Sequence, residues 1–293
     1  MEIQDVIVAL VLAVVEGITE FLPISSTGHM ILVEQVLPFS YGEGFRESFI
    51  VVIQLPAVLS VLLYFHRRLF PGWLSPLLRT FRSNAEATSG TDTSAPLPMH
   101  SSISIFRVWV LIVLAFIPAG IAGFLLRGFI EERLFHPLTV AVALAVGGIL
   151  LIVLERILPP ARTLAVEKMG YGEAFAVGVA QCAALVPGVS RSAATIIGGM
   201  ALGLSRTAAA EFSFFLAIPT MAGASTLSLL KHGMAFTPQQ WGLLLLGSVV
   251  SFAVAYASIA FLMRIVQRHS FAVFGWYRLI LGGCVLLGHF FRG

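Results

Sequence analysis

Apolar runs long enough to cross a lipid bilayer recur along the whole chain, and they limit its fold more than any other feature. A helix needs about 20 mostly apolar residues to span roughly 30 Å of hydrocarbon. Only 11% of the 293 residues are charged and 58% are hydrophobic, whereas a soluble domain carries about 25% charged residues. The chain is therefore predicted to be an all-α integral membrane protein with the bilayer as its solvent.

Six of these runs are predicted to be full transmembrane helices. They cover residues 48–66, 106–126, 138–158, 209–230, 240–263 and 270–291. Two further regions, 5–38 and 172–205, are hydrophobic but are interrupted by proline, glycine and small hydroxyl residues. Their second halves, 28–38 and 192–204, would reach only about 17–20 Å as helices, which is too short to cross. Both regions are therefore predicted to be re-entrant helix–loop–helix hairpins.

The order of these elements repeats, which predicts an inverted repeat within a single membrane domain, residues 1–293. One constant shift along the chain pairs Pro23 with Pro187, Ser26 with Ser190 and Glu47 with Glu211. The first repeat covers about 1–158 and the second about 170–293, each in the order hairpin, span, span, span. Three crossings between the hairpins make the second hairpin enter from the opposite face, so the two interrupted loops should meet near the midplane.

The basic residues predict the orientation, because Lys and Arg are retained preferentially on the cytoplasmic side. One set of loops holds eleven of them: Arg67, Arg68, Arg79, Arg82, Arg107, Arg156, Arg162, Lys168, Arg206, Arg264 and Arg268. The other set holds five: Arg46, Arg127, Arg133, Lys231 and Arg292. Both termini and the mouth of the first hairpin are therefore predicted to lie outside, and the polar connection of about 67–105 to be cytoplasmic. The net charge is only +3, and no nucleic-acid partner is expected.

The first interrupted loop concentrates ionisable and hydroxyl residues inside an apolar segment. It reads EGITEFLPISSTGH from Glu16 to His29. Glu16 and Glu20 are four residues apart, so they share a helix face, where both could hold one divalent cation or one could act as a base. The alternative is that the two glutamates reach a membrane interface. Acids inside a membrane are costly and are functional candidates by default, which favours the first interpretation.

Hydroxyl residues follow Pro23, which is expected to end the first half-helix. Ser25, Ser26 and Thr27 could cap the second half-helix, whose free N–H groups would then form an anion site at the break. His29 lies three residues after Ser26, a spacing that lets a hydroxyl and a base approach each other as nucleophilic attack requires. Alternatively, the hydroxyls are simply caps and His29 bonds a buried backbone carbonyl.

The second interrupted loop reads PGVSRS and places Arg191 between Ser190 and Ser192. A guanidinium offers five donors in a fixed fork that suits phosphate oxygens, so these three residues are candidate phosphate ligands. A structural ion pair of Arg191 with Glu20 is the competing interpretation. Arg191 is the only charge from Ala174 to Leu204, and an arginine there needs an anionic partner of some kind.

Three polar residues are weaker candidates. Gln54 and Gln181 lie in the middle of apolar segments and could line a pocket, but each could equally bond a neighbouring helix. Arg278 lies in the last predicted span. A contact with a lipid phosphate and an internal ion pair are both open for this arginine.

The motifs EGITEFLPISSTGHM at 16–30 and PGVSRSAATI at 187–196 resemble those of the undecaprenyl-diphosphatase family, which is associated with bacitracin resistance. Both occur in the family's order and spacing, and the resemblance extends over essentially the whole chain. It implies hydrolysis of undecaprenyl pyrophosphate to the monophosphate and inorganic phosphate. It places this reaction at the outer face of the bacterial cytoplasmic membrane, where it recycles the lipid carrier for peptidoglycan synthesis.

The resemblance also implies roles for individual residues. Glu16 and Glu20 match the family's acidic motif, Ser26 and His29 its proposed catalytic pair, and Arg191 its phosphate-binding arginine. A divalent cation, Mg²⁺ or Ca²⁺, is similarly implied. In the mechanism that we hypothesise, Ser26 attacks the terminal phosphorus in line, and His29 or Glu20 takes its proton. A variant in which His29 is itself the nucleophile, or activates water, stays open.

A secondary transporter or flippase for an anionic or prenyl-phosphate substrate is the alternative, because inverted repeats with broken helices also build transporters. Such a protein would use Arg191 and the half-helix dipoles. It would have no use for a hydroxyl, an imidazole and two carboxylates around one point, so the cluster favours a hydrolase. The expected partners are the polyprenyl pyrophosphate lipid and the bilayer, and a homodimer is compatible with the sequence.

Overall fold

The computed structural model describes residues 3–37, 39–70, 102–134, 136–158 and 160–291. These residues form helices, and the one β-type contact among them is an isolated bridge between Thr163 and Leu204. The α-helices are α1 (Ile3–Thr19), α2 (Ser26–Val36), α3 (Glu43–Val52), α4 (Gln54–Tyr64), α5 (His66–Leu69), α7 (Ser102–Arg133), α8 (Pro137–Ile157), α9 (Tyr171–Gln181), α10 (Arg191–Ala201), α11 (Arg206–His232), α12 (Pro238–Ile265) and α13 (Ala272–Phe290). Short 3₁₀ turns are η1 (Val166–Lys168), η2 (Cys182–Leu185) and η3 (Gly233–Ala235).

Six helical segments of the described chain are long and apolar enough to cross a membrane, which confirms the predicted spans. They are Gly44–Tyr64, Ile105–Leu126, Pro137–Ile157, Arg206–His232, Pro238–Ile265 and Ala272–Phe290. The first consists of α3 and α4 in succession, with a break at Ile53. Large apolar side chains such as Phe124, Leu245 and Ile280 are exposed on their outer faces, as a lipid-facing surface requires. Most of the predicted polar connection, residues 71–101, lies outside the described residues.

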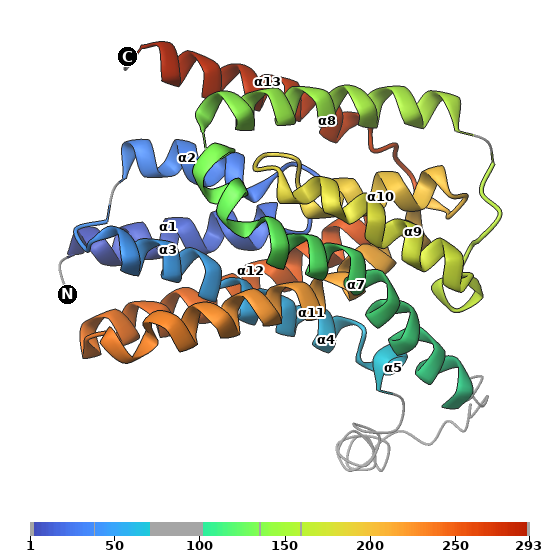
Figure 1. Ribbon diagram of the computed structural model, residues 1–293, viewed down its shortest axis with the longest axis horizontal. Helices are drawn as coiled ribbons and strands as arrows, with labels where there is room; N and C mark the ends of the chain where they lie inside the picture. The colour runs from blue at the N-terminus through green and yellow to red at the C-terminus, as the bar shows by residue number, and fades with distance from the viewer. Residues whose placement is uncertain (1–2, 38, 71–101, 135, 159, 292–293) are drawn as a thin grey trace, which may run out of the picture.

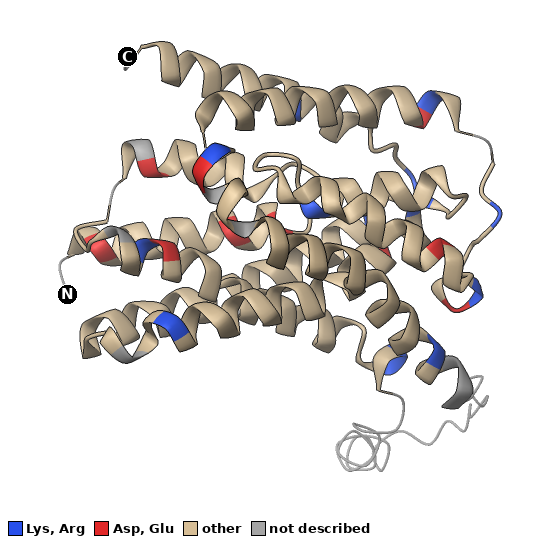
Figure 2. Ribbon diagram, in the orientation of Figure 1, with Lys and Arg blue, Asp and Glu red and all other residues tan. Residues whose placement is uncertain are grey.

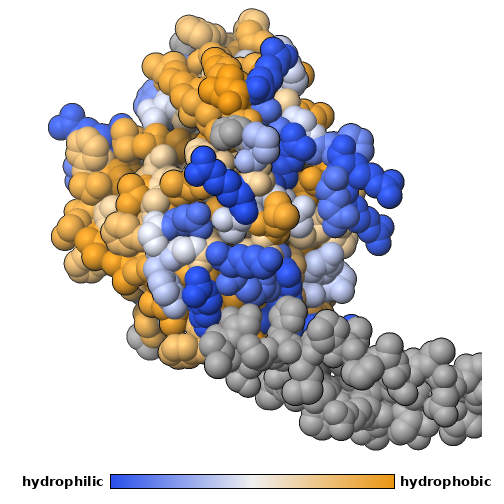
Figure 3. Space-filling view, turned by 90° about the vertical axis from the view of Figure 1, so that its right-hand side faces the viewer, coloured by the Kyte–Doolittle hydropathy of each residue, from blue (hydrophilic) through white to orange (hydrophobic). Residues whose placement is uncertain are grey.

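The helices lie mainly along the long axis of the molecule, so the connections gather at its two ends (Figure 1). The connections after α4, α8, α10 and α12 lie at the right-hand end. Those after α2, α7 and α11 lie at the left-hand end, together with the start of α1 and the end of α13. Lys and Arg residues are concentrated at the right-hand end (Figure 2). Figure 3 shows strongly hydrophilic side chains over this end, with apolar flanks beside them.

The two interrupted regions form the helix pairs α1 with α2 and α9 with α10. α1 runs from the left-hand end to a turn at residues 20–25 in the middle of the molecule, and α2 returns to the same end (Figure 1). α9 and α10 make the same excursion from the right-hand end. The second helix of each pair has 11 residues, which corresponds to about 17 Å. Both turns therefore lie well inside the helix bundle.

Glycines allow the first helix of each pair to pack closely against a long helix. A Cβ atom on Gly17 of α1 would lie 3.0 Å from the backbone nitrogen of Ala255 in α12. A Cβ atom on Gly178 of α9 would overlap the carbonyl of Ala115 in α7. Small residues permit such close backbone approach between membrane helices. The ends of α1 and α9 that face each other are thereby held in defined positions.

Candidate active site at the two interrupted hairpins

The helices α2 and α10 begin with the same strained turn. Ser25 has φ 72° and Ser190 has φ 71°, and no other non-glycine residue in the described chain has a positive φ. Such a conformation is costly for a residue with a side chain and tends to occur at functional sites. Each serine hydroxyl accepts a hydrogen bond from the N–H three residues later, Gly28 at 3.4 Å and Ala193 at 3.3 Å. Ser25 and Ser190 are therefore the N-caps.

This shared turn corrects the predicted alignment of the two hairpins. Ser25 corresponds to Ser190, so the predicted pairing of Ser26 with Ser190 is wrong by one position. The prediction compared residue types, whereas the backbone conformation defines equivalent positions. Ser26 is instead equivalent to Arg191, and each is the first residue of its helix. A hydroxyl and a guanidinium thus project from matching helix N-termini.

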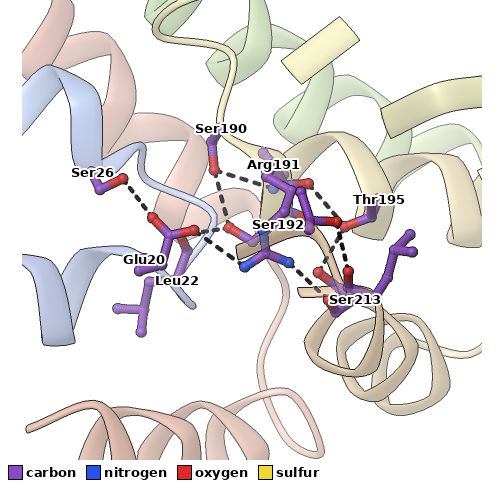
Figure 4. A network of polar contacts seen from close by, with 11 residues as sticks. Glu20, Leu22, Ser26, Ser190, Arg191, Ser192, Thr195 and Ser213 are labelled. Carbon is purple, nitrogen blue, oxygen red and sulfur yellow. Dashed lines mark hydrogen bonds and ion pairs between the residues drawn. The ribbon is translucent and has the colours of Figure 1, made fainter. Parts of the chain in front are cut away.

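Glu20 joins these two residues (Figure 4). The Ser26 hydroxyl donates to Glu20 Oε2 at 2.7 Å, and Arg191 Nη2 donates to Glu20 Oε1 at 3.3 Å. The side chains of Glu20 and Arg191 are only 8% and 9% exposed, so this ion pair is shielded from solvent. A carboxylate bonded to a hydroxyl can accept its proton, and the guanidinium beside it can stabilise negative charge.

Arg191 is held by α11 and still has an unused donor. Its Nη1 donates to the carbonyl of Ser213 at 2.8 Å. Its Nε is buried and has no hydrogen-bond partner. An unpaired donor on a buried guanidinium is costly, and a phosphate oxygen is a natural partner for it. The predicted ion pair with Glu20 is present, and it leaves one Arg191 donor without a partner.

The other predicted phosphate ligands mostly hold the loops together. The Ser192 hydroxyl donates to the carbonyl of Leu22 at 2.9 Å, which links the two loops directly. It also lies 3.0 Å from the Ser190 hydroxyl. The hydroxyls of Ser25 and Ser190 act as helix caps. Thr27 is half-buried and makes no side-chain hydrogen bond to another described residue, so its hydroxyl is free to contact a ligand.

His29 is not hydrogen-bonded to Ser26. Its Nδ1 lies 2.7 Å from the carbonyl of Ser25 and its Nε2 lies 2.7 Å from the Tyr277 hydroxyl. The imidazole also stacks on the Tyr277 ring, with centroids 5.5 Å apart. Both ring nitrogens therefore have partners. The contact with Ser25 matches the alternative from the sequence, in which His29 bonds a backbone carbonyl. Ser26 is bonded to Glu20 instead.

Comparison with known proteins gives the chain a family. The sequence matches the family described as bacitracin resistance protein BacA over residues 9–284. The chain belongs to the BacA family. It is 42% identical to an undecaprenyl-diphosphatase 1 of Clostridioides difficile (strain 630), covering 98% of this chain and 97% of that one. It is also 40% identical to an undecaprenyl-diphosphatase of Enterococcus faecalis, covering 98% of each chain.

A relative from Fusobacterium nucleatum subsp. nucleatum, also named undecaprenyl-diphosphatase, is 44% identical over 94% of this chain and 98% of its own. The BacA match includes both motifs, residues 16–30 and 187–196. The predicted family resemblance is therefore confirmed. In this BacA-family chain the two motifs, which are far apart in sequence, meet at Glu20 and Arg191.

Glu16 is the residue of this BacA-family site that most needs an additional partner. It is fully buried, and neither carboxylate oxygen has a hydrogen-bond partner of acceptable geometry. Glu20 and Gln54 are its polar neighbours. A buried carboxylate without a partner is strongly unfavourable unless a proton or cation accompanies it. Among the described residues, no three acidic, histidine or cysteine side chains are arranged so that they could hold a metal ion, so a cation here would be held by two carboxylates and neutral oxygens.

Sequence reasoning missed Tyr277. It lies on α13, 248 residues from the His29 that it contacts, and no local motif surrounds it. Gln181 was named as a weaker candidate, and it is 2% exposed with both polar atoms unpartnered. In the alignment that pairs Ser25 with Ser190, Gln181 is equivalent to Glu16. The two hairpins thus each bury an unpaired polar side chain at the same position.

Proposed function

We propose that the chain hydrolyses undecaprenyl diphosphate to undecaprenyl phosphate and inorganic phosphate. The named relatives support the activity, because they are 40–44% identical over nearly their full length. The observation that carries the proposal is the chain of contacts from the Ser26 hydroxyl through the Glu20 carboxylate to Arg191. In the proposed reaction, Ser26 would be the nucleophile, Glu20 the base and Arg191 the phosphate-binding cation.

In the proposed reaction, Ser26 Oγ attacks the terminal phosphorus while Glu20 Oε2 accepts its proton. The anhydride P–O bond breaks, undecaprenyl phosphate leaves with the bridging oxygen, and Ser26 carries the phosphoryl group. Glu20 passes the accepted proton to the departing undecaprenyl phosphate and is ionised again. Water then attacks this phosphoserine and loses a proton to Glu20, which passes it to Ser26 Oγ as the serine P–O bond breaks and inorganic phosphate is released. Arg191 and the free N–H groups at the start of α2 and α10 stabilise the charge on the transferred group. The short Ser26–Glu20 bond favours Glu20 over His29 as the base.

An apolar groove beside the site offers a place for the lipid chain. The groove has a volume of about 450 Å³ and runs between α1 and α12. Ile18 and Leu22 line it from the first hairpin, and Val254 and Phe261 line it from α12. Leu22 is two residues from Glu20, so a prenyl chain in this groove would leave its diphosphate near the reacting groups.

The proposed placement in the membrane follows the predicted repeat, about 1–158 and about 170–293. The pair α1 and α2 would be a re-entrant hairpin from one face, and α9 and α10 its inverted counterpart from the other. The concentration of basic residues at the right-hand end of Figure 2 supports assigning that end to the cytoplasm. Both termini and the opening of the first hairpin would then face outward. Hydrolysis at the outer face would recycle the carrier for peptidoglycan synthesis and confer bacitracin resistance.

The direct test is phosphate release from undecaprenyl diphosphate by the detergent-purified protein, comparing wild type with Ser26→Ala. We expect the substitution to lower kcat by about 10³-fold or more, since it removes the nucleophile. Ser60→Ala is the matched control, because Ser60 is a buried serine that donates only to the carbonyl of Ala57 in its own helix. Full turnover by Ser26→Ala would exclude the serine mechanism. Absence of release by folded wild type would favour the transporter or flippase.

We also propose that Glu16 and Glu20 hold a divalent cation, Mg²⁺ or Ca²⁺. The unpartnered oxygens of Glu16 fit such an ion, because hard cations prefer carboxylate ligands. When bound, the cation would neutralise part of the diphosphate charge. We expect Mg²⁺ or Ca²⁺ to raise the Tm of wild-type protein treated with EDTA, and to do so much less in Glu16→Gln. An equal rise in Tm in both proteins would contradict this ligand assignment.

A further inference from the structure

Arg278 is a fully buried arginine that lies on α13 and is surrounded by backbone carbonyls. It donates five hydrogen bonds: Nε to Leu144 at 3.3 Å, Nη1 to Pro23 at 3.3 Å and to Val189 at 2.9 Å, and Nη2 to Ala143 at 3.1 Å and to Gly188 at 3.1 Å. A guanidinium has five N–H donors. All of them are therefore used, and none is left for a phosphate group.

The carbonyls come from three separate segments. Pro23 belongs to the first interrupted loop, and Gly188 and Val189 belong to the second. Pro23 and Gly188 are equivalent positions, because each lies two residues before a strained serine cap. The remaining two carbonyls belong to α8, which serves as a fixed support.

No carboxylate forms an ion pair with Arg278 among the described residues. Neither of the two roles that the sequence left open, a lipid-phosphate contact or an internal ion pair, is therefore present. A charged side chain inside a membrane protein is costly, and an apolar side chain would pack there without that cost. What Arg278 provides instead is a single rigid group that binds both loops. Within the described part of the chain, the other side-chain hydrogen bonds between the loops are those of Arg191 with Glu20 and of Ser192 with Leu22.

We propose that Arg278 is a positioning residue, which sets the separation of the two loops without touching the substrate. By holding Pro23 it places Ser26, three residues later, and by holding Val189 it places Arg191, two residues later. The role in turnover rests on the proposed phosphatase activity. The physical claim, that one guanidinium orders both loops, does not depend on that activity.

The packing of α8 against α13 offers a second way to move this guanidinium. A Cβ atom on Gly147 of α8 would overlap Arg278 Nη2 and would lie 2.8 Å from its Cζ. Gly147→Ala therefore displaces the guanidinium and keeps its charge. Gly282→Ala is the matched control in the same pair of helices. The three atoms nearest to its Cβ would belong to Ala141, Leu144 and Ala145, at 3.1–3.7 Å, and none of them to Arg278.

The experiment measures steady-state phosphate release per folded protein, together with hydrogen exchange of the two loops, in Arg278→Lys, Gly147→Ala and Gly282→Ala. Lysine keeps the charge but has only three donors. We expect Arg278→Lys and Gly147→Ala to lower kcat about 100-fold, with KM close to the wild-type value, because small misplacements of reacting groups have effects of this size. Exchange should accelerate in residues 20–28 and 186–193 together and stay unchanged in α12. Gly282→Ala should behave like wild type in both measurements.

Three results would overturn the proposal. The first is wild-type kcat in Arg278→Lys, which would mean that charge alone matters. The second is a lower Tm with unchanged kcat per folded protein, the mark of a purely structural role. The third is faster exchange in one loop only or throughout the protein. If wild type released no phosphate, the proposed function would fail, and the hydrogen-exchange comparison would still decide whether Arg278 orders both loops.

Discussion

Replacing Glu20 with glutamine is expected to lower kcat about 10³-fold, because the amide cannot take the proton that the Ser26 hydroxyl loses. The same change leaves the buried Arg191 without its anionic partner, and breaking a buried ion pair costs about 3–5 kcal/mol. The variant should therefore also unfold at a lower temperature. Phosphate release and thermal unfolding of the purified variant check the two effects separately.

Glu34→Gln is the control for this prediction. Glu34 lies on α2 in the same hairpin and forms an ion pair with Arg46 at 3.4 Å, but its side chain is 23% exposed. Solvent-exposed pairs contribute only about 0–1 kcal/mol, and this pair is partly exposed, so turnover should stay at the wild-type value and Tm should fall much less than in Glu20→Gln. A Glu20→Gln protein that turned over as fast as Glu34→Gln would show that another group is the base.

Substituting lysine for Arg191 is expected to lower kcat/KM about 10³-fold, although the positive charge is kept. Arg191 bonds Ser213 and Glu20 with different nitrogens and keeps Nε for a further acceptor. An ammonium group cannot reach two fixed acceptors and a phosphate oxygen in this planar arrangement. Losing an arginine that stabilises phosphoryl transfer costs about 10³–10⁵ in rate. Turnover of the lipid and inhibition by inorganic diphosphate, which should weaken in parallel, are the measurements.

Arg206→Lys is the matched control. Arg206 makes a bidentate pair with Glu155, with Nε donating to Oε1 at 2.9 Å and Nη2 to Oε2 at 2.6 Å, and its side chain is 45% exposed. Loss of that geometry should leave kcat/KM almost unchanged. If Arg191→Lys kept wild-type affinity for inorganic diphosphate, the guanidinium would serve only as the counter-ion of Glu20.

Many residues of the candidate site could be picked out from the sequence because they lie in two short segments. Apolar runs made the glutamates, the hydroxyls and Arg191 conspicuous, since each is costly in a membrane. Their mutual contacts were less predictable. The spacing of Ser26 and His29 allowed a pair, but the turn at Ser25 directs the hydroxyl to Glu20 and the imidazole to Tyr277. Backbone conformation at one residue decided that outcome, and residue spacing does not specify it.

By itself, the sequence determined the six spans, the interruptions in two further hydrophobic regions and the polar side chains that make up the candidate site. These properties depend on local hydrophobicity, on helix-breaking residues and on groups that are adjacent in the chain. The tertiary structure alone decided which groups meet. Glu20 and Arg191 are 171 residues apart, and Arg278 reaches carbonyls up to 255 residues away. Such contacts depend on how whole helices pack, since glycines such as Gly147 leave room for a guanidinium that no local pattern reveals.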